Sequence, residues 1–205
     1  MSYIIGVAGY SGSGKSTFSK VLSNVLNVPV ICQDAFYIGK EAMMDRCLDV
    51  NNFDLPEALD ICLLHSIYHD VKANEGCTLI IPKYDYLVQE RVGSTTLNVA
   101  GNVIVEGNLI HSIDSLRRRV DFLIYMDISS SLAKERRFAR DQAQRGYSLE
   151  ECKTYYDKYV VDSISQISSL KQEADFVVEV GENNKETYVD DVAAVINILS
   201  VARPL

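Results

Sequence analysis

Short apolar runs alternate with longer amphipathic segments along most of the chain. The apolar runs cover residues 3–8, 28–32, 103–107, 122–127 and 175–180. Runs of about four to eight apolar residues are typical of strands that are buried on both faces of a parallel sheet. The segments between them place apolar residues three and four positions apart, which is the spacing of one helical face. The pattern predicts an α/β fold whose parallel sheet is covered by helices on both faces.

The helical segments have recognisable ends. The first helix is expected to end near Asn27, and further helices are expected over 56–73, 131–145, 148–170 and 185–200. Pro56 suits a first helical turn, Ser129 or Ser130 suits the cap of the third helix, and Ser148 suits the cap of the fourth. Residues 38–55 show little periodicity, so we expect a loop there.

The region around 78–100 has a different pattern. Three β-prone segments at 78–82, 84–88 and 95–99 are interrupted by Pro82 and Gly93. Proline and glycine are unfavourable inside a central strand. We therefore expect a small antiparallel flap, inserted into a single domain that spans residues 1–205.

Composition and charge limit the classes of molecule that the protein is expected to bind. Of the 205 residues, 47% are hydrophobic and 23% charged, and neither a membrane span nor a signal peptide is apparent. Five scattered cysteines without a C-x-x-C pair suggest reduced thiols and a cytoplasmic location. A net charge of −8 argues against nucleic acid as a partner. The basic island from Arg117 to Arg145 fits a small anionic ligand better.

The stretch that follows the first apolar run carries the strongest motif. It matches G-x-x-x-x-G-K-[S/T], with the candidate phosphate-binding residues Gly9, Ser11, Gly12, Ser13, Gly14, Lys15, Ser16 and Thr17. Glycines let successive N–H groups face phosphate oxygens, and the helix that follows presents its positive end to the same anion. Lys15 can reach the outer phosphates and Ser16 can bind Mg²⁺. A flexible turn and a dinucleotide-binding loop are the disfavoured alternatives.

Two acidic residues follow predicted strands. Asp34 comes after 28–32, and Glu106 ends the run at 103–107. Open α/β sheets bind ligands at the carboxyl ends of their strands, where Glu106 could lie close to a metal ion. Capping a turn or helix is the alternative role for each carboxylate, and the residues alone leave both roles open.

Basic residues cluster on the helix predicted over 131–145. The cluster consists of Lys134, Arg136, Arg137, Arg140 and Arg145. It forms either a solvated face or an arginine lid, at about 134–147, that closes over a polyphosphate. The triplet at 117–119 ends the preceding helix and is interpreted as structural. His65 and His69 are four residues apart, but a metal site would need further ligands, so ordinary histidines are favoured.

Together these segments resemble the uridine kinase (uridine–cytidine kinase) family of phosphate-loop kinases. The similarity extends from Ile4 to about Val180. It rests on GYSGSGKST, QDAFY at 33–37, NFDLPEALD at 52–60, PKYDY at 82–86, VEG at 105–107 and RRFARDQAQRG at 136–146. The resemblance implies a five-stranded parallel sheet with a β-hairpin flap over the acceptor. It also implies phosphoryl transfer from ATP or GTP, with Mg²⁺, to the 5′-hydroxyl of a ribonucleoside, and a homotetramer.

The resemblance also implies roles for individual residues. Asp34 matches the catalytic base, Asp54 the carboxylate that binds ribose hydroxyls, and Arg137 an arginine between ribose and phosphate. Lys15 belongs with Asp34 and Arg137 in the catalytic set. Substrate contacts are expected from Tyr37, Phe53, Tyr84 and Gln89. Triphosphate contacts are expected from Arg140 and Arg145, and metal contacts from Ser16 and Glu106.

The chain departs from the family where the base is read. Gln89 replaces a histidine of the flap, Tyr147 replaces an arginine, and Tyr155 replaces a glutamine. Uridine and cytidine are therefore the first expectation, with nicotinamide riboside, pantothenate or ribulose phosphate as alternative acceptors. A nucleotide sensor without turnover is a further alternative. A GTPase is disfavoured because D-x-x-G is absent and the stretch at 184–187 lacks the final aspartate of N-K-x-D.

Overall fold

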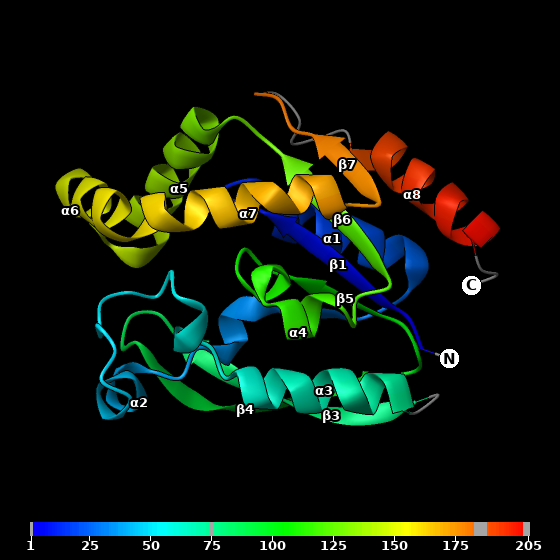
Figure 1. Cartoon of the computed structure of the whole chain (residues 1–205), viewed down its shortest axis with the longest axis horizontal. Helices are drawn as coiled ribbons and strands as arrows, with labels where there is room; N and C mark the ends of the chain where they lie inside the picture. The colour runs from blue at the N-terminus through cyan, green and yellow to red at the C-terminus, as the bar shows by residue number, and fades with distance from the viewer. Residues whose placement is uncertain (1, 74–75, 183–187, 203–205) are drawn as a thin grey trace.

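The centre of the molecule is a five-stranded parallel sheet. The structure, a computed structural model, describes residues 2–73, 76–182 and 188–202. The sheet has the order β2-β5-β1-β6-β7 (Figure 1). Its strands are β1 (Ile4–Gly9), β2 (Val30–Cys32), β5 (Val103–Glu106), β6 (Phe122–Asp127) and β7 (Phe176–Glu179). Each of them matches an apolar run of the sequence, with β1 extending one residue beyond its run to Gly9, so the predicted sheet is confirmed.

Helices cover both faces of the sheet. Ile4 and Ala8 face the core shared with α3 (Ile61–Ala73) and α7 (Val161–Glu173). Ile5 and Val7 face the core shared with α1 (Lys15–Leu26) and α8 (Tyr188–Ala202). Figure 1 shows α7 crossing one face while α1 lies behind the sheet. Because successive strand residues alternate between two buried faces, every position of β1 is apolar or glycine.

Two predicted helices begin close to their expected positions, and one does not. Ser129 caps α5 (Ser130–Arg145) by accepting a hydrogen bond from Leu132 N at 3.3 Å. Ser148 caps α6 (Leu149–Tyr155) in a capping box. The helix expected from residue 56 begins later, because residues 56–58 form the 3₁₀ turn η2 (Pro56–Ala58). Asp60 instead accepts the cap bond from Leu63 N at 3.0 Å, so α3 starts at Ile61.

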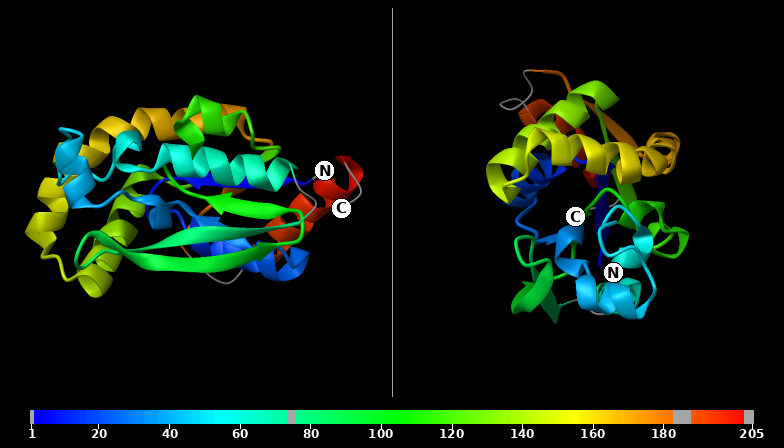
Figure 2. Two further views of the ribbon diagram at one scale, coloured as in Figure 1. Left: turned by 90° about the horizontal axis from the view of Figure 1, so that it is seen from below. Right: turned by 90° about the vertical axis from the view of Figure 1, so that its left-hand side faces the viewer.

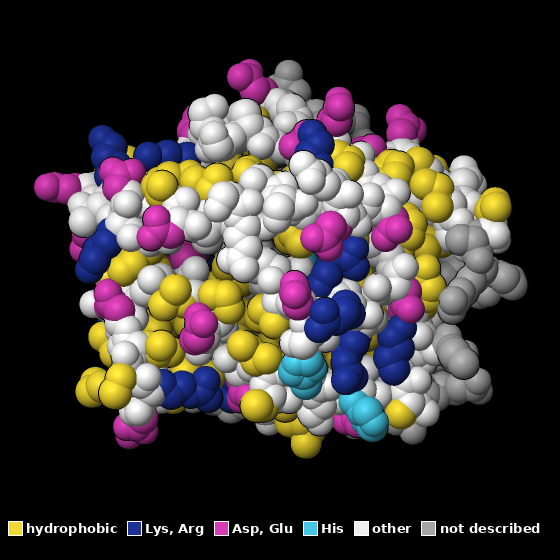
Figure 3. All heavy atoms as spheres, viewed as in Figure 1, with side chains coloured by type: hydrophobic (Ala, Val, Ile, Leu, Met, Phe, Trp, Pro, Cys, Tyr) yellow, Lys and Arg dark blue, Asp and Glu magenta, His cyan; other side chains and the backbone are white. Residues whose placement is uncertain are grey.

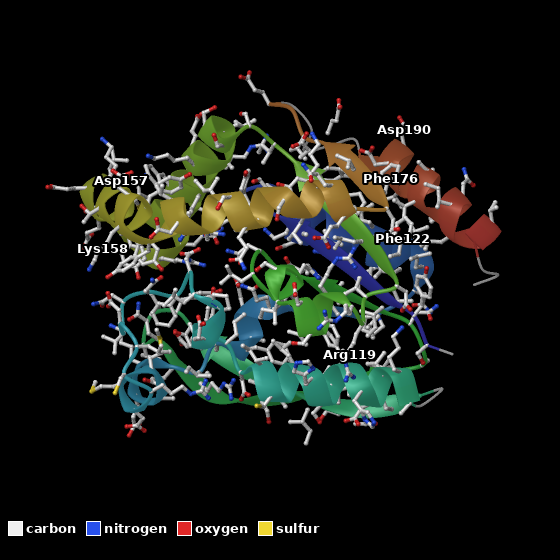
Figure 4. The ribbon with its side chains drawn as sticks, in the orientation of Figure 1. Arg119, Phe122, Asp157, Lys158, Phe176 and Asp190 are labelled. Atoms are coloured by element: carbon white, nitrogen blue, oxygen red, sulfur yellow. The ribbon has the colours of Figure 1, made fainter. Side chains whose placement is uncertain are left out.

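The single helix predicted over 148–170 is interrupted. Between α6 and α7 lies a π-helical turn, η4 (Tyr156–Val160), whose residues Asp157 and Lys158 are labelled in Figure 4. Within the predicted loop 38–55, residues 40–45 form α2 (Lys40–Asp45). A six-residue helix is too short for apolar periodicity to reveal it. The last helix is described from Tyr188, so its predicted first residues, 185–187, lie outside the described residues.

The flap is a two-stranded antiparallel hairpin. Its strands are β3 (Cys77–Asp85) and β4 (Glu90–Val99), which run beside α3 (Figure 2). The first two predicted segments of this region form one strand, with a shift in register between Lys83 and Tyr84. Residues 86–88, expected as part of a strand, form the turn together with Gln89, which adopts a left-handed φ of 56°.

Short turns complete the fold. They are η1 (Gln33–Phe36), η3 (Ile110–Ser112) and α4 (Asp114–Arg117). None of the helices in the described part of the chain has both the length and the apolar composition that a membrane crossing requires.

Candidate active site

The loop between β1 and α1 curls as the motif predicts. Gly12 and Gly14 adopt left-handed φ values of 92° and 89°. A Cβ atom on Gly12 would lie 2.4 Å from the carbonyl oxygen of Ala133, so glycine is required there. Ser13 N donates to the carbonyl oxygen of Tyr10 at 3.0 Å and closes the turn.

Lys15 lies folded over this loop. Its Nζ donates to the carbonyl oxygens of Gly9, at 3.0 Å, and Tyr10, at 2.8 Å. Burial lowers the pKa of Lys15, although the nearby carboxylates of Glu106 and Asp34 act in the opposite direction. The ammonium group is thus held at the carboxyl end of the sheet, close to two acidic side chains.

A serine and a glutamate meet beside the lysine. Ser16 Oγ donates to Glu106 Oε1 at 2.8 Å, and Glu106 is buried at the end of β5. Glu106 caps no helix, because the N-cap position of η3 is Leu109. Both side chains offer oxygen, which is the ligand type that Mg²⁺ prefers, so they fit this ion. Thr17 follows them and is exposed.

The three histidines do not form a metal site. His65 Nε2 lies 2.9 Å from Ser115 Oγ, and His69 Nδ1 lies 3.4 Å from the Asp70 carboxylate. His111 is buried under the sheet, with Nε2 3.0 Å from the carbonyl oxygen of Val105. Among the described residues, no group of three or more His, Cys, Asp or Glu side chains is placed to hold a metal ion.

A cleft of about 450 Å³ extends from the phosphate loop toward the flap. Its lining includes Ser11 together with the predicted residues Asp34, Tyr37, Phe53, Asp54, Tyr84, Gln89, Arg137, Arg140 and Arg145. Asp34 is on η1 but is not its cap residue, which is Cys32. The elements that supply these side chains converge in the left-hand half of Figure 1. The structure therefore brings all the predicted acceptor-side residues into one cavity.

Aromatic rings form one wall of the cleft. The ring centre of Tyr37 lies 5.4 Å from that of Phe53 and 5.3 Å from that of Tyr84. Tyr86, which the predicted site left out, lies 5.3 Å from Tyr84 in the same wall. The hydroxyl group of Tyr84 is buried and has no hydrogen-bond partner among the described residues, and Tyr86 lies next to Asp34. Burial raises the pKa of Tyr84, so this hydroxyl stays protonated and can donate to a ligand.

Asp54 and Arg137 form a buried ion pair in the cleft. Arg137 NH1 donates to Asp54 Oδ1 at 3.2 Å, and NH2 donates to Oδ2 at 2.9 Å. Burial alone raises the pKa of Asp54, but the Arg137 guanidinium, together with the Tyr155 hydroxyl and Arg145, outweighs it and holds the pKa below its usual value. Asn108 Nδ2 also donates to Asp54, at 3.4 Å. The carboxylate is therefore ionised and fixed in place.

The three positions that depart from the family lie in the cleft but differ in role. Gln89 Nε2 donates to the hydroxyl oxygen of Tyr147 at 3.3 Å, at the exposed end of the flap. The Tyr155 hydroxyl accepts a hydrogen bond from Phe53 N at 3.1 Å, and it lies next to Asp54. Tyr155 thus supports the acceptor loop through its polar end.

Sequence reasoning missed two supporting residues. Gln33 is fully buried, and its Oε1 accepts from the backbone N–H groups of Leu109, at 2.8 Å, and Ile110, at 3.0 Å. Arg91 of the flap donates to the carbonyl oxygen of Tyr37 at 2.8 Å and to Asp60 at 3.0 Å. Gln33 lies within a motif quoted for the resemblance, whereas Arg91 has no signal in the local pattern.

Some basic residues of α5 point into the cleft, and others point away from it. Arg137, Arg140 and Arg145 line the cleft, and Arg140 NH2 donates to Ser11 Oγ at 3.2 Å. Arg136 turns away and donates to the carbonyl oxygen of Gly181 at 2.8 Å. Lys134 lies 4.3 Å from the ring centre of Tyr156. Only part of the predicted lid therefore faces the cleft.

The triplet at 117–119 belongs to a separate basic area. Lys and Arg side chains gather with histidines over α3 and α4 on the right of Figure 3, and Figure 4 places Arg119 beside these helices. Arg117 donates to the carbonyl oxygen of Glu173 at 2.9 Å and pairs with its carboxylate at 3.4 Å. This pairing agrees with a structural role for Arg117.

A phosphate loop at the carboxyl end of a parallel sheet, opening into a cleft lined by carboxylates and arginines, defines a phosphate-loop kinase. Comparison with known proteins leads to the same class. The chain belongs to the Phosphoribulokinase / Uridine kinase family, whose model matches residues 4–187. It is an ATP-dependent phosphotransferase of this family.

Two relatives illustrate the similarity in sequence. A uridine kinase from Shewanella pealeana is 34% identical over 89% of this chain and 90% of its own length. Uridine-cytidine kinase B from Dictyostelium discoideum is 32% identical over 89% of this chain and 76% of its own length.

Solved structures support the fold. A provisionally assigned fructose transport system kinase from Silicibacter aligns with a TM-score of 0.72 at 20% identity, over 86% of this chain and 89% of that one. A gluconokinase from Sinorhizobium meliloti aligns with a TM-score of 0.57 at 17% identity, over 98% and 94%.

Proposed function

We propose that the protein is a nucleoside kinase that transfers the γ-phosphoryl group of ATP or GTP to the 5′-hydroxyl of a ribonucleoside, most readily uridine or cytidine. The observation that carries this proposal is the cleft itself. It joins Ser11 of the phosphate loop to Asp34 and then to the Asp54–Arg137 pair, beside the aromatic wall. Two relatives named as kinases of uridine or of uridine and cytidine support the acceptor class.

Proton removal is assigned to Asp34. A ribose hydroxyl is a weak nucleophile at neutral pH, so a carboxylate that takes its proton during attack speeds the transfer. Asp34 lies in the cleft, close enough to Lys15 for the two charges to interact. A module that only bound nucleotide would have no use for a carboxylate at this position.

Stabilisation of the negative charge on the transferring phosphoryl group is assigned to Lys15 and the arginines that line the cleft. Lys15 would exchange its two carbonyl partners for phosphate oxygens, and Arg140 already contacts the loop through Ser11. Ser16 and, through water, Glu106 would hold Mg²⁺, which neutralises phosphate charge when bound. Ser16 and Glu106 keep each other oriented through their hydrogen bond.

Ribose recognition is assigned to Asp54 and Arg137. A carboxylate has about four lone-pair positions; Arg137 and Asn108 occupy three of those on Asp54, and a ribose hydroxyl would take the fourth in competition with the neighbouring Tyr155 hydroxyl. The base would lie against Tyr84 near Gln89, whose amide group both donates and accepts. This pair of functions fits uracil and cytosine without strict selection, so we expect relaxed pyrimidine specificity.

The remaining partners follow from the same proposal. The protein would act on small molecules in the cytoplasm, with neither nucleic acid nor a membrane as partner, and the family resemblance favours a homotetramer. Nicotinamide riboside, pantothenate and ribulose phosphate are the competing acceptors.

A coupled ADP-release assay tests the proposal. Wild type is compared on uridine, cytidine, their 2′-deoxy forms, nicotinamide riboside, pantothenate and ribulose phosphate. We expect turnover with the two ribosides and little with the deoxy forms. Asp34→Asn should lower turnover about 10²- to 10⁴-fold with ATP binding nearly unchanged, as for loss of a general base. Asp45→Asn, at an exposed carboxylate on α2, is the control. If no riboside is phosphorylated, the nucleoside assignment is wrong.

A further inference from the structure

The carboxylate of Asp141 on α5 holds three arginines at once. Its Oδ2 lies 3.5 Å from Arg137 Nε, and its Oδ1 lies 2.8 Å from Arg140 NH2 and 3.3 Å from Arg145 NH1. Only 6% of Asp141 is exposed. Arg140 donates hydrogen bonds to this buried carboxylate and Arg137 and Arg145 form ion pairs with it, so moving any of the three guanidinium groups away leaves its charge less fully paired.

These arginines reach two different parts of the cleft. Arg140 NH2 donates to Ser11 Oγ in the phosphate loop, whereas Arg137 makes its double hydrogen bond with Asp54. Asp141 is thus the common partner of a side chain beside the donor phosphates and of a side chain beside the acceptor. A ligand that changes the hydrogen bonds of either arginine changes those of Asp141 as well.

The charges of this cluster are unequal. The carboxylates of Asp54 and Asp141 face three guanidinium groups, so the cluster retains positive charge. A polyphosphate bound beside Ser11 would attract Arg140 and Arg145 and weaken their contacts with Asp141. Asp141 would then pair more fully with Arg137 Nε, while NH1 and NH2 of Arg137 stay on Asp54, so the Arg137–Asp54 pair would be more rigid before the acceptor arrives. Such preorganisation strengthens binding because less order has to be imposed by the acceptor.

We propose that Asp141 is a positioning residue that couples donor binding to acceptor binding, so that each ligand tightens the other. The inference rests on the proposed function, since it requires a polyphosphate donor and a riboside acceptor. Coupling between two binding sites is reciprocal, and its usual size is about 5- to 150-fold.

A thermodynamic cycle measured by calorimetry tests this coupling. Uridine is titrated into the protein with and without saturating Mg²⁺ and β,γ-imido-ATP. In wild type the analogue should tighten uridine binding by at least about fivefold. In Asp141→Asn both ligands should still bind, but the analogue should no longer tighten uridine binding. Glu135→Gln removes an exposed carboxylate from the same helix and should keep the wild-type coupling.

Each outcome decides the inference. Equal coupling in Asp141→Asn and wild type overturns the inference. A wild type whose affinity for uridine does not change when the analogue is bound also overturns it. If wild type binds the analogue but no riboside, the proposed acceptor class is wrong, and the proposed coupling is then wrong as well. Should Asp141→Asn fail to fold, Arg140→Gln removes the link to Ser11 at a side chain that is 31% exposed. Unchanged coupling in that variant also overturns the inference.

Discussion

The donor end and the acceptor end of the cleft are built in different ways. At the donor end one continuous stretch, Gly9 to Thr17, supplies the loop, the lysine and the serine, and Glu106 joins it from the neighbouring strand. At the acceptor end the side chains come from η1, the loop before η2, the flap, α5 and α6. The donor end works through backbone geometry, which tolerates few changes. The acceptor end works through separate side chains, so single substitutions can change its specificity while the fold is kept.

The largest effect is expected at the donor end, from Lys15→Ala. The ammonium group is positioned by the carbonyl oxygens of Gly9 and Tyr10, and no other residue of the loop carries a positive charge. Loss of a preorganised electrostatic contact typically costs about 10²- to 10³-fold in turnover. Lys20→Ala, at an exposed lysine on the same helix, should leave turnover unchanged. Near-normal phosphoryl transfer by Lys15→Ala would show that the loop is not the donor site.

This contrast explains what the sequence could predict. The phosphate loop was predictable because its geometry depends on neighbours in the chain, chiefly glycines with left-handed φ values. The buried strands were predictable because each is a short, continuous run of apolar residues in the chain. The pairing of Asp54 with Arg137 was not, because 83 positions separate them and only the packing of α5 against the acceptor loop brings them together.

Local signals also failed where packing decides the structure. The π turn interrupts a segment with continuous helical character, and its Tyr156 packs against Phe138 with ring centres 5.7 Å apart. Arg91 acts through backbone carbonyls, which no sequence pattern marks. Asp141 had a usable signal, since arginines lie four residues before and after it on one helical face.

At the acceptor end, Asp54→Asn should weaken the distinction between ribose and deoxyribose. The substitution removes the charge that pairs with Arg137 and leaves that guanidinium buried without its partner. We expect kcat/KM for uridine to fall by about 10²-fold, with a smaller fall for 2′-deoxyuridine. Asp49→Asn is the matched control, since Asp49 lies in the same loop outside the cleft and bonds to Tyr159. An unchanged ratio between uridine and 2′-deoxyuridine would remove Asp54 from ribose recognition.

The free energy of unfolding should decrease at acidic pH because of His111, which is buried against β5. Burial lowers the pKa of His111 to about 4, against about 6.5 in the unfolded chain. The unfolded state therefore binds more protons between these pH values, so this contribution to stability is complete above pH 6.5 and is lost as the pH falls toward 4. Between pH 7.5 and 5.0 the loss should be about 2 kcal/mol.

Urea unfolding at the two pH values measures this effect. His111→Gln should lose less stability than wild type on acidification, whereas His65→Gln, at the histidine bonded to Ser115, should behave like wild type. Equal losses in His111→Gln and wild type would show that other groups cause the acid sensitivity.

The smallest effect is expected at the outer end of the acceptor site, from Gln89→His. Gln89 is at a left-handed position of the flap turn, which histidine tolerates better than most residues, so the hairpin should keep its shape. A histidine ring presents one donor or acceptor to a pyrimidine edge, where the glutamine amide presents both. We expect a change of a few fold in kcat/KM, toward uridine and cytidine and away from other ribosides, because a single hydrogen bond contributes about 1 kcal/mol. Tyr147→Phe removes the hydroxyl that Gln89 contacts and should relax base selection without favouring pyrimidines. If both variants match wild type on every riboside, the base does not reach the flap turn, and the acceptor end stops at the aromatic wall formed by Tyr37, Phe53, Tyr84 and Tyr86.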